Sequence, residues 1–571
     1  MKYPKLIACF LIPSLLAGTA LAAEHYVSPS GDDTHDGSLA QPWLTLTHAV
    51  SAMAGGDTTY IRAGNYAGAG YRNINPKSGT PSSYTTFQGY PGDALPVIDC
   101  QGTPDDGMLR DATQTGVFRI GGIANQAYIR IAGLHLKGGG GNESGTITLG
   151  YASQTISDVI VESCIISDTN VGGVGYDNPA HIRISFGGFV RNATFRDCEI
   201  YGPDAAGFKI DGRACTNITI SHNYIHNAVH GIAVKWGNNL NDNIQLSYNI
   251  IRDCSGVGFY NNQANVFFEH NLVYNIGNSG VRWGDMEYIT EKVQLLHNTF
   301  YNCGYGIIHD YWNFNPAGVM RNNLLIQPGP SSLLPLSIWP YVASSLPHGT
   351  TVANNGYYNA ASSQVIREYG VGYTYAEWAA HFPADNASKQ VFSMDKIFVD
   401  PANGRFELVS NSPFKNAASD GTDMGADMAL VGIQGGPVNS FAEWRAQFFL
   451  GADLSNDAVS GPAADPDGTG VTNFQRYAHA LAARGIIANP VTLGTVDSAG
   501  LRYLTLSFNR RAVATGLSYI VEASSDLIIW TPVPGQAFAA GSPTRVTAQD
   551  TVAVAPPGVP RRFLRLRIVT P

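Results

Sequence analysis

The segments Asn217-Ile-Thr-Ile-Ser-His-Asn223, Asn243-Ile-Gln-Leu-Ser-Tyr-Asn249 and Asn265-Val-Phe-Phe-Glu-His-Asn271 repeat one pattern along the chain. Each alternates apolar and polar residues for several positions, which is the periodicity of a β-strand. From Asn192, successive copies start 25, 26, 22 and 27 residues apart. A second alternating segment follows a turn in each copy, as in His230-Gly-Ile-Ala-Val-Lys235. Two or three short strands in each coil of this length predict an all-β chain folded as a right-handed parallel β-helix.

A column of asparagines marks one bend of the predicted coil. Asn tolerates the left-handed conformation of a tight bend, and its amide can bond to the next coil, so we expect a structural ladder there with no catalytic role. The ladder consists of Asn223, Asn249, Asn271, Asn298 and Asn323, with Cys164 and Cys198 continuing it toward the N-terminus. Because several cysteines fall at repeat positions, we expect most of the six cysteines after residue 23 to be buried and unpaired.

The first 23 residues have the pattern of a cleaved secretory signal, with a basic start, a short apolar middle and small residues before a polar segment. We therefore expect a secreted, monomeric protein, and no later segment is long and apolar enough to span a membrane. The chain has 571 residues, a formal net charge of −9 and 14% charged residues. This negative charge argues against a nucleic-acid partner, although a local basic groove for an acidic polymer is compatible with it.

Changes of pattern divide the rest of the chain. We predict the β-helix over residues 24–430, a linker with short helices over 431–490 and a small β-sandwich over 491–571, where alternating strand patterns return. Within the linker, Asp465-Pro-Asp-Gly-Thr-Gly470 places oxygen ligands at alternate positions before a glycine, as calcium loops do. The twelfth position is Arg476 where such a loop carries an acid, so a Ca²⁺ loop and a plain turn both stay open. No other cofactor is predicted.

Both ends of the predicted solenoid resemble those of secreted β-helix carbohydrate-active proteins, the pectate-lyase-like superfamily. The segments His25-Tyr-Val-Ser-Pro29 and Gln41-Pro-Trp43 are similar to the N-terminal cap of such proteins, and residues 57–66 to their first coil. Ile397-Phe-Val-Asp-Pro401 and Gly425-Ala-Asp427 are similar to their last coils. The resemblance implies a solenoid that acts on carbohydrate, and it is specific for architecture rather than for a reaction.

Strand parity assigns the two sides of the second strand in each coil. Its apolar residues should point inward: Phe208, Ile210, Ile232, Val234, Val257 and Phe259. With coils about 4.8 Å apart, their neighbours should then form one outer stripe of Lys209, Asp211, Lys235, Gly258, Tyr260 and Arg282. Charged and aromatic residues near this stripe complete the predicted site: Arg213, Trp236, Trp283 and Asp310.

A cationic groove with aromatic neighbours suits an extended acidic polysaccharide. Cleavage of a uronate by β-elimination requires that the carboxylate is neutralised and that a base removes the adjacent proton. A lysine among other cations has a lowered pKa, so Lys235 or Lys209 is the predicted base. Arg282 would neutralise the carboxylate and Tyr260 would protonate the leaving oxygen. The predicted substrate-binding residues are Asp211, Arg213, Trp236, Trp283 and Asp310.

The segment His230-Gly-Ile-Ala-Val-Lys-Trp-Gly237 resembles the base-bearing strand of family 9 pectate lyases. Those enzymes hold calcium with an aspartate cluster in a nearby coil, whereas this chain has isolated Asp204 and Asp211 there, which favours a metal-independent lyase. Two alternatives stay open. A glycoside hydrolase needs two carboxyl groups about 5–10 Å apart, for which Asp285 and Asp310 are the better pair. A non-catalytic glycan-binding surface protein would use the same face without chemistry.

Overall fold

The computed structural model describes residues 22–91, 93–100, 116–121, 124–140, 145–151, 154–169, 179–186, 188–211, 214–235, 241–263, 265–283, 293–309, 318–329, 334–338, 351–368, 370–382, 385, 387–433, 441, 444–445, 456–466, 468–479, 481, 490–498, 500–511, 517–539, 545–554 and 561–569. The predicted signal segment lies almost entirely outside these residues.

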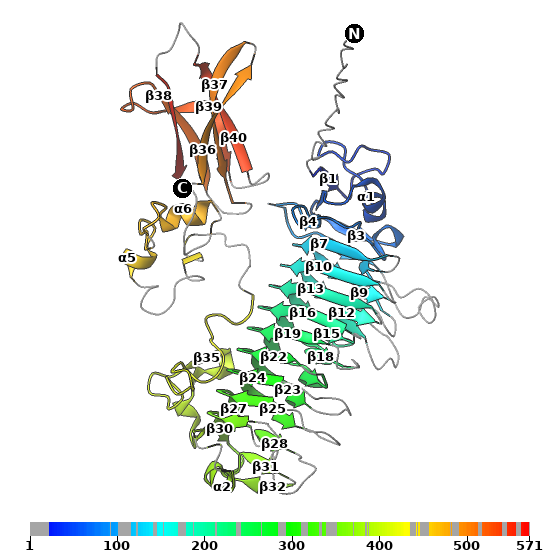
Figure 1. Ribbon diagram of the computed structural model, residues 1–571, viewed down its shortest axis with the longest axis vertical. Coiled ribbons are helices and arrows are strands. Elements are labelled where there is room, and N and C mark those ends of the chain that lie inside the picture. The colour runs from blue at the N-terminus through cyan, green and yellow to red at the C-terminus, as the bar shows by residue number, and fades with distance from the viewer. Residues whose placement is uncertain are drawn as a thin grey trace, which may run out of the picture.

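Parallel strands stack coil upon coil along most of the described chain (Figure 1). The first sheet has 12 strands in the order β1 (Glu24–Val27), β2 (Thr58–Ile61), β4 (Thr85–Gly89), β7 (Gln126–Ala132), β10 (Thr155–Glu162), β13 (Phe189–Arg196), β16 (Ala214–Ser221), β19 (Asp242–Ser247), β22 (Val266–Glu269), β24 (Val293–Leu296), β26 (Gly318–Arg321) and β29 (Thr351–Ala353). This regular order confirms the predicted right-handed parallel β-helix.

Two further sheets share the long strands β23 (Leu272–Trp283) and β25 (Thr299–His309). The second sheet also contains β3 (Asn65–Ala67), β5 (Val97–Asp99), β8 (His135–Lys137), β11 (Ile165–Ser167), β14 (Glu199–Tyr201), β17 (Tyr224–His226), β20 (Ile250–Arg252), β27 (Leu324–Gln327), β30 (Gly356–Asn359) and β33 (Lys389–Gln390). The third contains β6 (Phe118–Ile120), β9 (Ile147–Tyr151), β12 (Ala180–Phe186), β15 (Ala206–Ile210), β18 (Ile232–Val234), β21 (Val257–Asn261), β28 (Leu336–Ile338) and β31 (Ile366–Glu368), with β32 (Val371–Tyr373) antiparallel at its end. The third sheet carries the stripe that strand parity singled out.

The asparagine ladder forms as predicted and continues to Asn355. In each rung the side-chain oxygen of one Asn accepts the backbone N–H of the Asn one coil earlier, as Asn271 does from Asn249 at 2.9 Å. The Asn271 amide nitrogen donates to the carbonyls of Leu246 (2.9 Å) and Glu269 (3.0 Å). The ladder therefore satisfies backbone groups that the fold buries at this bend.

The left-handed residue of this bend differs from the prediction. It is the residue before each ladder asparagine: His222, Tyr248, His270, His297 and Asn322, with φ between 51° and 62°. Where these are aromatic, their rings stack along the solenoid, with centroids of Tyr248 and His270 4.9 Å apart. The ladder asparagines are thus selected for their amide bonds and not for their backbone conformation.

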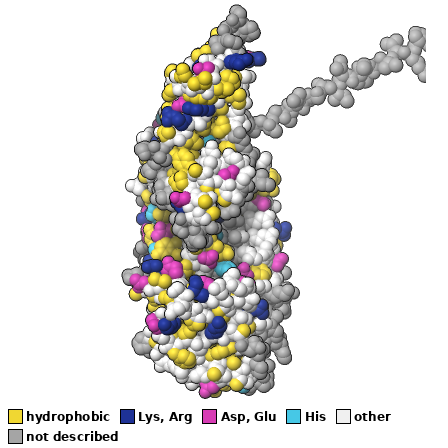
Figure 2. Space-filling view, turned by 90° about the vertical axis from the view of Figure 1, so that its left-hand side faces the viewer, with side chains coloured by type: hydrophobic (Ala, Val, Ile, Leu, Met, Phe, Trp, Pro, Cys, Tyr) yellow, Lys and Arg dark blue, Asp and Glu magenta, His cyan; other side chains and the backbone are white. Residues whose placement is uncertain are grey.

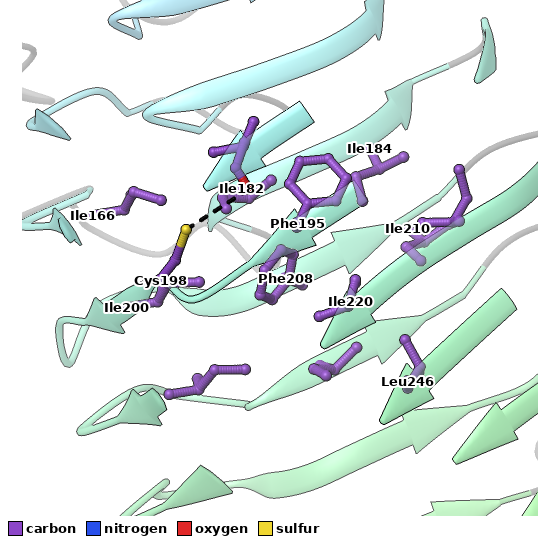
Figure 3. Packing of buried hydrophobic residues seen from close by; sticks show 14 of the residues in the cluster. Ile166, Ile182, Ile184, Phe195, Cys198, Ile200, Phe208, Ile210, Ile220 and Leu246 are labelled. Atoms are coloured by element: carbon purple, nitrogen blue, oxygen red, sulfur yellow. Dashed lines mark hydrogen bonds between the residues drawn. The ribbon is translucent and has the colours of Figure 1, made fainter. Parts of the chain in front are cut away.

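Apolar side chains from all three sheets fill one core, which runs the length of the solenoid. Figure 3 shows Phe195 from the first sheet, Ile200 from the second and Phe208 from the third pointing toward one another, with Phe195 and Phe208 centroids 5.6 Å apart. Helix α1 (Leu46–Ala52) contributes Leu46 to one end of this core, and α2 (Tyr375–His381) contributes Trp378 to the other. All six cysteines after residue 23 are buried and free of disulfides, which confirms that prediction: Cys100, Cys164, Cys198, Cys215, Cys254 and Cys303.

A corner of the third sheet has no room for side chains. Five glycines stack there, one per coil: Gly207, Gly231, Gly258, Gly280 and Gly306. A Cβ on Gly231 would lie 2.4 Å from the carbonyl oxygen of Gly258 and 2.4 Å from Cγ2 of Ile251. The backbone of the next coil therefore occupies the space that a side chain would need.

After β33 the chain runs back along the second sheet. It forms two short 3₁₀ helices, η2 (Met394–Lys396) and η3 (Pro401–Asn403), and the hairpin of β34 (Phe398–Asp400) and β35 (Arg405–Leu408); a third 3₁₀ turn, η1 (Ala69–Tyr71), lies near the N-terminus. Phe398 and Phe406 of the hairpin belong to a second apolar cluster with Leu272 and Leu324 of the second sheet. This returning segment covers part of the second sheet.

The C-terminal residues form two antiparallel sheets, β36 (Val491–Ser498), β37 (Leu501–Asn509) and β40 (Arg545–Ala553), and β39 (Thr531–Ala539), β38 (Ser518–Ser524) and β41 (Phe563–Val569). Phe508 of one sheet and Tyr519 of the other share a core, which confirms the predicted small β-sandwich. The helices α5 (Asp457–Ser460) and α6 (Asn473–Ala478) precede it. Trp444 and Tyr477 belong to the same core, so residues placed in the predicted linker pack as part of this C-terminal module.

The predicted calcium loop contains a cation of its own. Asp465 accepts hydrogen bonds from the Gly470 N–H at 2.6 Å and the Thr469 hydroxyl at 3.1 Å, while Asp467 lies outside the described residues. The fully buried Arg476 donates to the Thr469 hydroxyl at 3.0 Å and to the Val471 carbonyl at 3.3 Å. Its charge lowers the pKa of Asp465 together with these hydrogen bonds. The described part of the loop is therefore a turn stabilised by an arginine.

Candidate active site

Strand register brings three of the predicted residues, Lys209, Tyr260 and Arg282, into one column on the outer face of the third sheet. Successive Cα partners form a column of Arg183, Lys209, Ala233, Tyr260 and Arg282. The opposite parity forms the inner column of Ile182, Phe208, Ile232, Phe259 and Val281, all without exposed surface. Asp211 and Lys235 follow these strands and lie in the next outer row, since the Lys235 N–H donates to the Ile210 carbonyl at 2.9 Å.

The predicted inward orientation of Val257 was wrong. Val257 does not belong to the main core, although it has the same strand parity as the buried Phe259. Val257 packs instead with Ala233 and Tyr260 in a small apolar cluster on the outer face. The stripe therefore has an apolar patch beside its charges.

Lys209 and Asp211 point away from the core, as predicted, but both are buried beneath the surface. Asp211 accepts a hydrogen bond from the Arg183 guanidinium, and its Oδ2 lies 3.6 Å from the Lys209 Nζ. Lys209 is only 2% exposed, and Arg183 is buried to the same degree. The three side chains form a buried ion cluster with one negative and two positive groups.

Burial governs the protonation of this cluster. It lowers the pKa of Lys209 to about 8, with further lowering from the positive charges of Arg183 and Lys235, while Asp211 acts in the opposite sense. Burial also raises the pKa of Asp211, although Arg183 and Lys209 oppose that shift. Lys209 is thus close to the pH range in which it releases its proton.

Lys235 and Arg282 both lie over one aromatic ring, that of Tyr260. The Lys235 Nζ lies 4.0 Å from the centroid of the Tyr260 ring, and the Arg282 Cζ lies 5.8 Å from it. Both cations are partly exposed, whereas Tyr260 is nearly buried against Ala233 and Val257. The quadrupole of the ring attracts both cations, so Tyr260 holds two positive charges at the surface in fixed positions.

His230 is a neighbour that strand parity did not single out. Its Nδ1 accepts the Val257 N–H at 3.0 Å, and burial together with the charges of Lys235 and Lys209 lowers its pKa to about 4. A neutral imidazole therefore lies beside the two lysines at neutral pH. His230 heads the alternating segment with the parity of the inward Ile232 and Val234, so alternation gave no signal that it belongs to the site. Arg183 could have been found, because it alternates with Ile182 and Ile184 in the same way that Lys209 does with its neighbours.

Trp283 does not enter this site. Trp283 was predicted to bind substrate, but its side chain has no exposed surface and belongs to the main core. Its ring abuts Gly318, where an added Cβ would lie 1.8 Å from it. Arg213, Trp236 and Asp310 lie outside the described residues, as does Asp285 of the alternative hydrolase pair.

The described residues contain no group of three or more His, Cys, Asp or Glu side chains that could hold a metal ion. The carboxylate of the cluster, Asp211, is surrounded by Arg183, Lys209 and Lys235, so these residues do not fit a calcium ion. A cavity of about 540 Å³ lies elsewhere, between His270 and His297 of the solenoid and residues 406–429 of the returning segment, and contains none of the candidate residues. None of the described helices has the length and apolar character needed to cross a membrane.

Part of the chain is similar in sequence to known proteins. Residues 25–288 match the family model described as "Pel9A-like, right handed beta helix region". The pectate lyase PEL9 of Emericella nidulans is 37% identical over 104 residues, which is 18% of this chain and a quarter of that protein's length. The crystal structure of pectate lyase Pel9A superposes with a TM-score of 0.40 at 14% identity, over 72% of this chain and 97% of that one. The GH136 lacto-N-biosidase from Eubacterium ramulus superposes with a TM-score of 0.38 at 15% identity, over 65% of this chain and 67% of that one. The segment from residue 25 to residue 288 is therefore similar to the Pel9A-like right-handed β-helix region, in agreement with the parallel β-helix of the described residues.

Proposed function

We propose that this protein is a polysaccharide lyase that cleaves a uronate-containing acidic polysaccharide by β-elimination on the outer face of the third sheet. The observation that carries the proposal is the pair of partly exposed cations, Lys235 and Arg282, held on one Tyr260 ring above a buried ion cluster. The family match and the short identity to a pectate lyase support the same reaction class.

The charge balance of the site favours an anionic substrate. Arg183, Lys209, Lys235 and Arg282 carry four positive charges in their protonated forms, against the single carboxylate of Asp211. A uronate carboxylate entering above Tyr260 would therefore be attracted to Arg282, which can bind it through two parallel hydrogen bonds. Neutralising that carboxylate acidifies the proton on the adjacent carbon, which is the first requirement of the elimination.

Exposure distinguishes the two candidate bases. Lys209 does not reach the surface, whereas Lys235 is partly exposed and can approach a sugar. In the proposed reaction the neutral Lys235 amine takes the proton next to the carboxylate, the electron pair forms a carbon–carbon double bond, and the bond to the glycosidic oxygen breaks. A general acid then returns a proton to that oxygen, a role we propose for Tyr260.

The cations replace a metal in this proposal. Because Asp211 is already engaged by Arg183 and Lys209, no step is assigned to calcium. Lys209 then acts as a buried positive charge near Lys235, where like charge disfavours the protonated form of a neighbour. We assign Lys209 this positioning role in place of direct contact with substrate.

The test is to incubate the protein with pectate, alginate and glycosaminoglycans and to follow the ultraviolet absorbance of the unsaturated uronate. We expect new absorbance with at least one polymer, and a loss of about 10²- to 10⁴-fold in Lys235→Ala, as for removal of a general base. Lys235→Arg keeps the charge and cannot act as a base at neutral pH, so it should retain polymer binding and lose the reaction.

The matched control is Lys137→Ala, which removes an outward lysine of the second sheet and should leave the activity unchanged. New reducing ends without absorbance would assign a hydrolase instead. Binding without either product would assign a non-catalytic glycan-binding protein. Activity that survives in Lys235→Ala would exclude Lys235 as the base.

We also propose that the protein is secreted, on the pattern of its first 23 residues. Expression of the full chain in a bacterial host should yield, outside the cytoplasm, a product whose N-terminus lies at or near residue 23 or 24. Recovery of uncleaved chain only from the cytoplasm would contradict this proposal.

A further inference from the structure

The β38–β39 loop of the C-terminal module presents three large aliphatic side chains to water. Leu527 is 56% exposed, Ile528 is 82% exposed and Ile529 is 67% exposed. Trp530 follows them, partly buried, at the start of β39. Single exposed aliphatic residues are common on proteins, but a contiguous group of them marks a surface that meets an apolar partner.

Hydrogen bonds fix the conformation of this loop. The Asp526 carboxylate accepts the backbone N–H groups of Ile528 and Ile529, both at 2.8 Å. The Ser524 hydroxyl accepts the N–H groups of Asp526 and Leu527, at 3.2 and 2.9 Å. Leu527 adopts φ of 65°, a left-handed conformation that is unfavourable for a bulky side chain. These hydrogen bonds therefore keep the aliphatic side chains exposed, although the backbone conformation of Leu527 is unfavourable and exposed apolar surface costs free energy.

Charges of both signs lie beside this apolar tip, since Asp526 belongs to the loop and Glu522 pairs with Arg565 and Arg567, each at 2.7 Å. The Arg565 guanidinium lies 4.4 Å from the centroid of the Trp530 ring, and Phe563 pairs with Ser524, so the exposed Arg561 lies at the loop end of β41. Residues 491–571 contain eight Arg, no Lys and four acidic residues, a formal charge of +4 in a chain of −9. The space-filling view shows basic side chains among apolar ones on the upper part of the molecule, where the module lies (Figure 2).

We propose that this loop inserts Leu527, Ile528 and Ile529 into the surface of a phospholipid bilayer with anionic headgroups. Its aliphatic side chains enter the boundary of the acyl region, the Trp530 ring lies at the level of the headgroups, and the exposed Arg561 contacts phosphate groups. Apolar insertion and attraction to anionic lipid together determine the strength of such interfacial binding. Two copies of the chain each carry a net charge of −9 and repel one another, whereas anionic lipid attracts the positive module, so charge favours the lipid partner.

Flotation of the full-length protein with vesicles tests this proposal. One vesicle population contains phosphatidylcholine alone and the other contains phosphatidylcholine with phosphatidylglycerol. We expect binding to the anionic vesicles, weaker binding at high salt, and a loss of roughly tenfold for each of the substitutions Ile528→Asn and Ile529→Asn. Arg561→Gln should weaken binding to the anionic vesicles alone.

The matched control is Leu493→Asn on the edge strand β36, which removes an aliphatic side chain that is 62% exposed in the same module. It should bind vesicles as the unsubstituted protein does, and thermal melting should confirm that each variant is folded. Quenching of Trp530 fluorescence by brominated lipid, absent in Trp530→Phe, reports insertion of the loop itself. Equal binding of the Ile528→Asn variant would overturn the proposal. Self-association of the protein that Ile528→Asn abolishes, with no vesicle binding, would also overturn it and assign the loop to a second copy.

Discussion

The substitution Asp211→Asn tests the buried ion cluster beneath the candidate site. The Asp211 carboxylate accepts a hydrogen bond from Arg183 and lies 3.6 Å from the Lys209 Nζ. Asn keeps the size of the side chain and removes its charge, so two buried cations lose the carboxylate between them. The structure therefore predicts a loss of stability as well as a change in the site.

The expected loss of unfolding free energy can be worked out for Lys209 and Arg183 in turn. Removing one partner of a buried ion pair costs about 3–5 kcal/mol, because the other charge stays buried without compensation. Lys209 can escape part of this cost, since its pKa is about 8 and release of its proton at pH 7 costs only about 1.4 kcal/mol per pKa unit. Arg183 cannot release its proton. We therefore expect Asp211→Asn to lower the free energy of unfolding at pH 7 by about 3–5 kcal/mol.

Urea titrations of the unsubstituted protein, Asp211→Asn, Lys209→Met and the double variant measure this loss and form a double-mutant cycle. A coupling energy above about 1 kcal/mol between Asp211 and Lys209 is expected for charges in contact. Asp253→Asn is the control, because Asp253 pairs with Arg252 on the partly exposed second sheet and should cost less than about 1 kcal/mol. If Asp211→Asn unfolds within about 0.5 kcal/mol of the unsubstituted protein, as an ordinary surface substitution does, the described cluster does not stabilise the fold.

Three other predictions address the ladder, the glycine column and the titration of Lys209. Asn271→Ala leaves the Leu246 carbonyl and the Asn249 N–H unpaired in the core and should lower the free energy of unfolding by about 2–6 kcal/mol in urea titration; a loss below about 1 kcal/mol would contradict the ladder's role. Gly231→Ala should cost about 1–3 kcal/mol by the same measurement, because its Cβ overlaps the next coil, and an unchanged midpoint would refute that overlap. Burial lowers the pKa of Lys209 to about 8 from 10.5, so between these values the unfolded chain holds a proton that the folded chain has lost. Stability should therefore rise with pH across this window, by about 3 kcal/mol in total, and the rise should be absent from Lys209→Met; parallel pH profiles of the two proteins would rule it out.

The solenoid could be predicted because its signal is repeated in every coil. The spacing of Asn223, Asn249 and Asn271 gives the coil length, and the alternation before each gives the strands. The same spacing predicted the ladder, yet it could not tell which residue of the bend takes the left-handed conformation. That choice depends on the path of the backbone between two sheets, and both the ladder asparagine and the residue before it can adopt this conformation.

The alternation of side chains along the strands of the third sheet predicted part of the candidate site. It placed Lys235, Tyr260 and Arg282 on the outer face, because alternation decides which side of a strand a residue faces. It could not show that Lys209 lies buried beneath that face, since burial depends on neighbouring coils. It also failed at Val257, which has the same parity as the inward Phe259 but packs with Ala233 and Tyr260. Gly258, between the two, lies in the glycine column at the corner of the sheet, where simple alternation does not hold.

The glycine column limits how this molecule can change its length. At that corner each coil fits directly against the backbone of the next, so the distance between coils is fixed by main-chain atoms that every coil shares. A single inserted residue would shift a side chain into this contact, whereas a duplicated or deleted coil brings its own glycine and keeps the contact intact. Natural or engineered variants should therefore lengthen or shorten the outer face of the third sheet in steps of one whole coil, about 4.8 Å each.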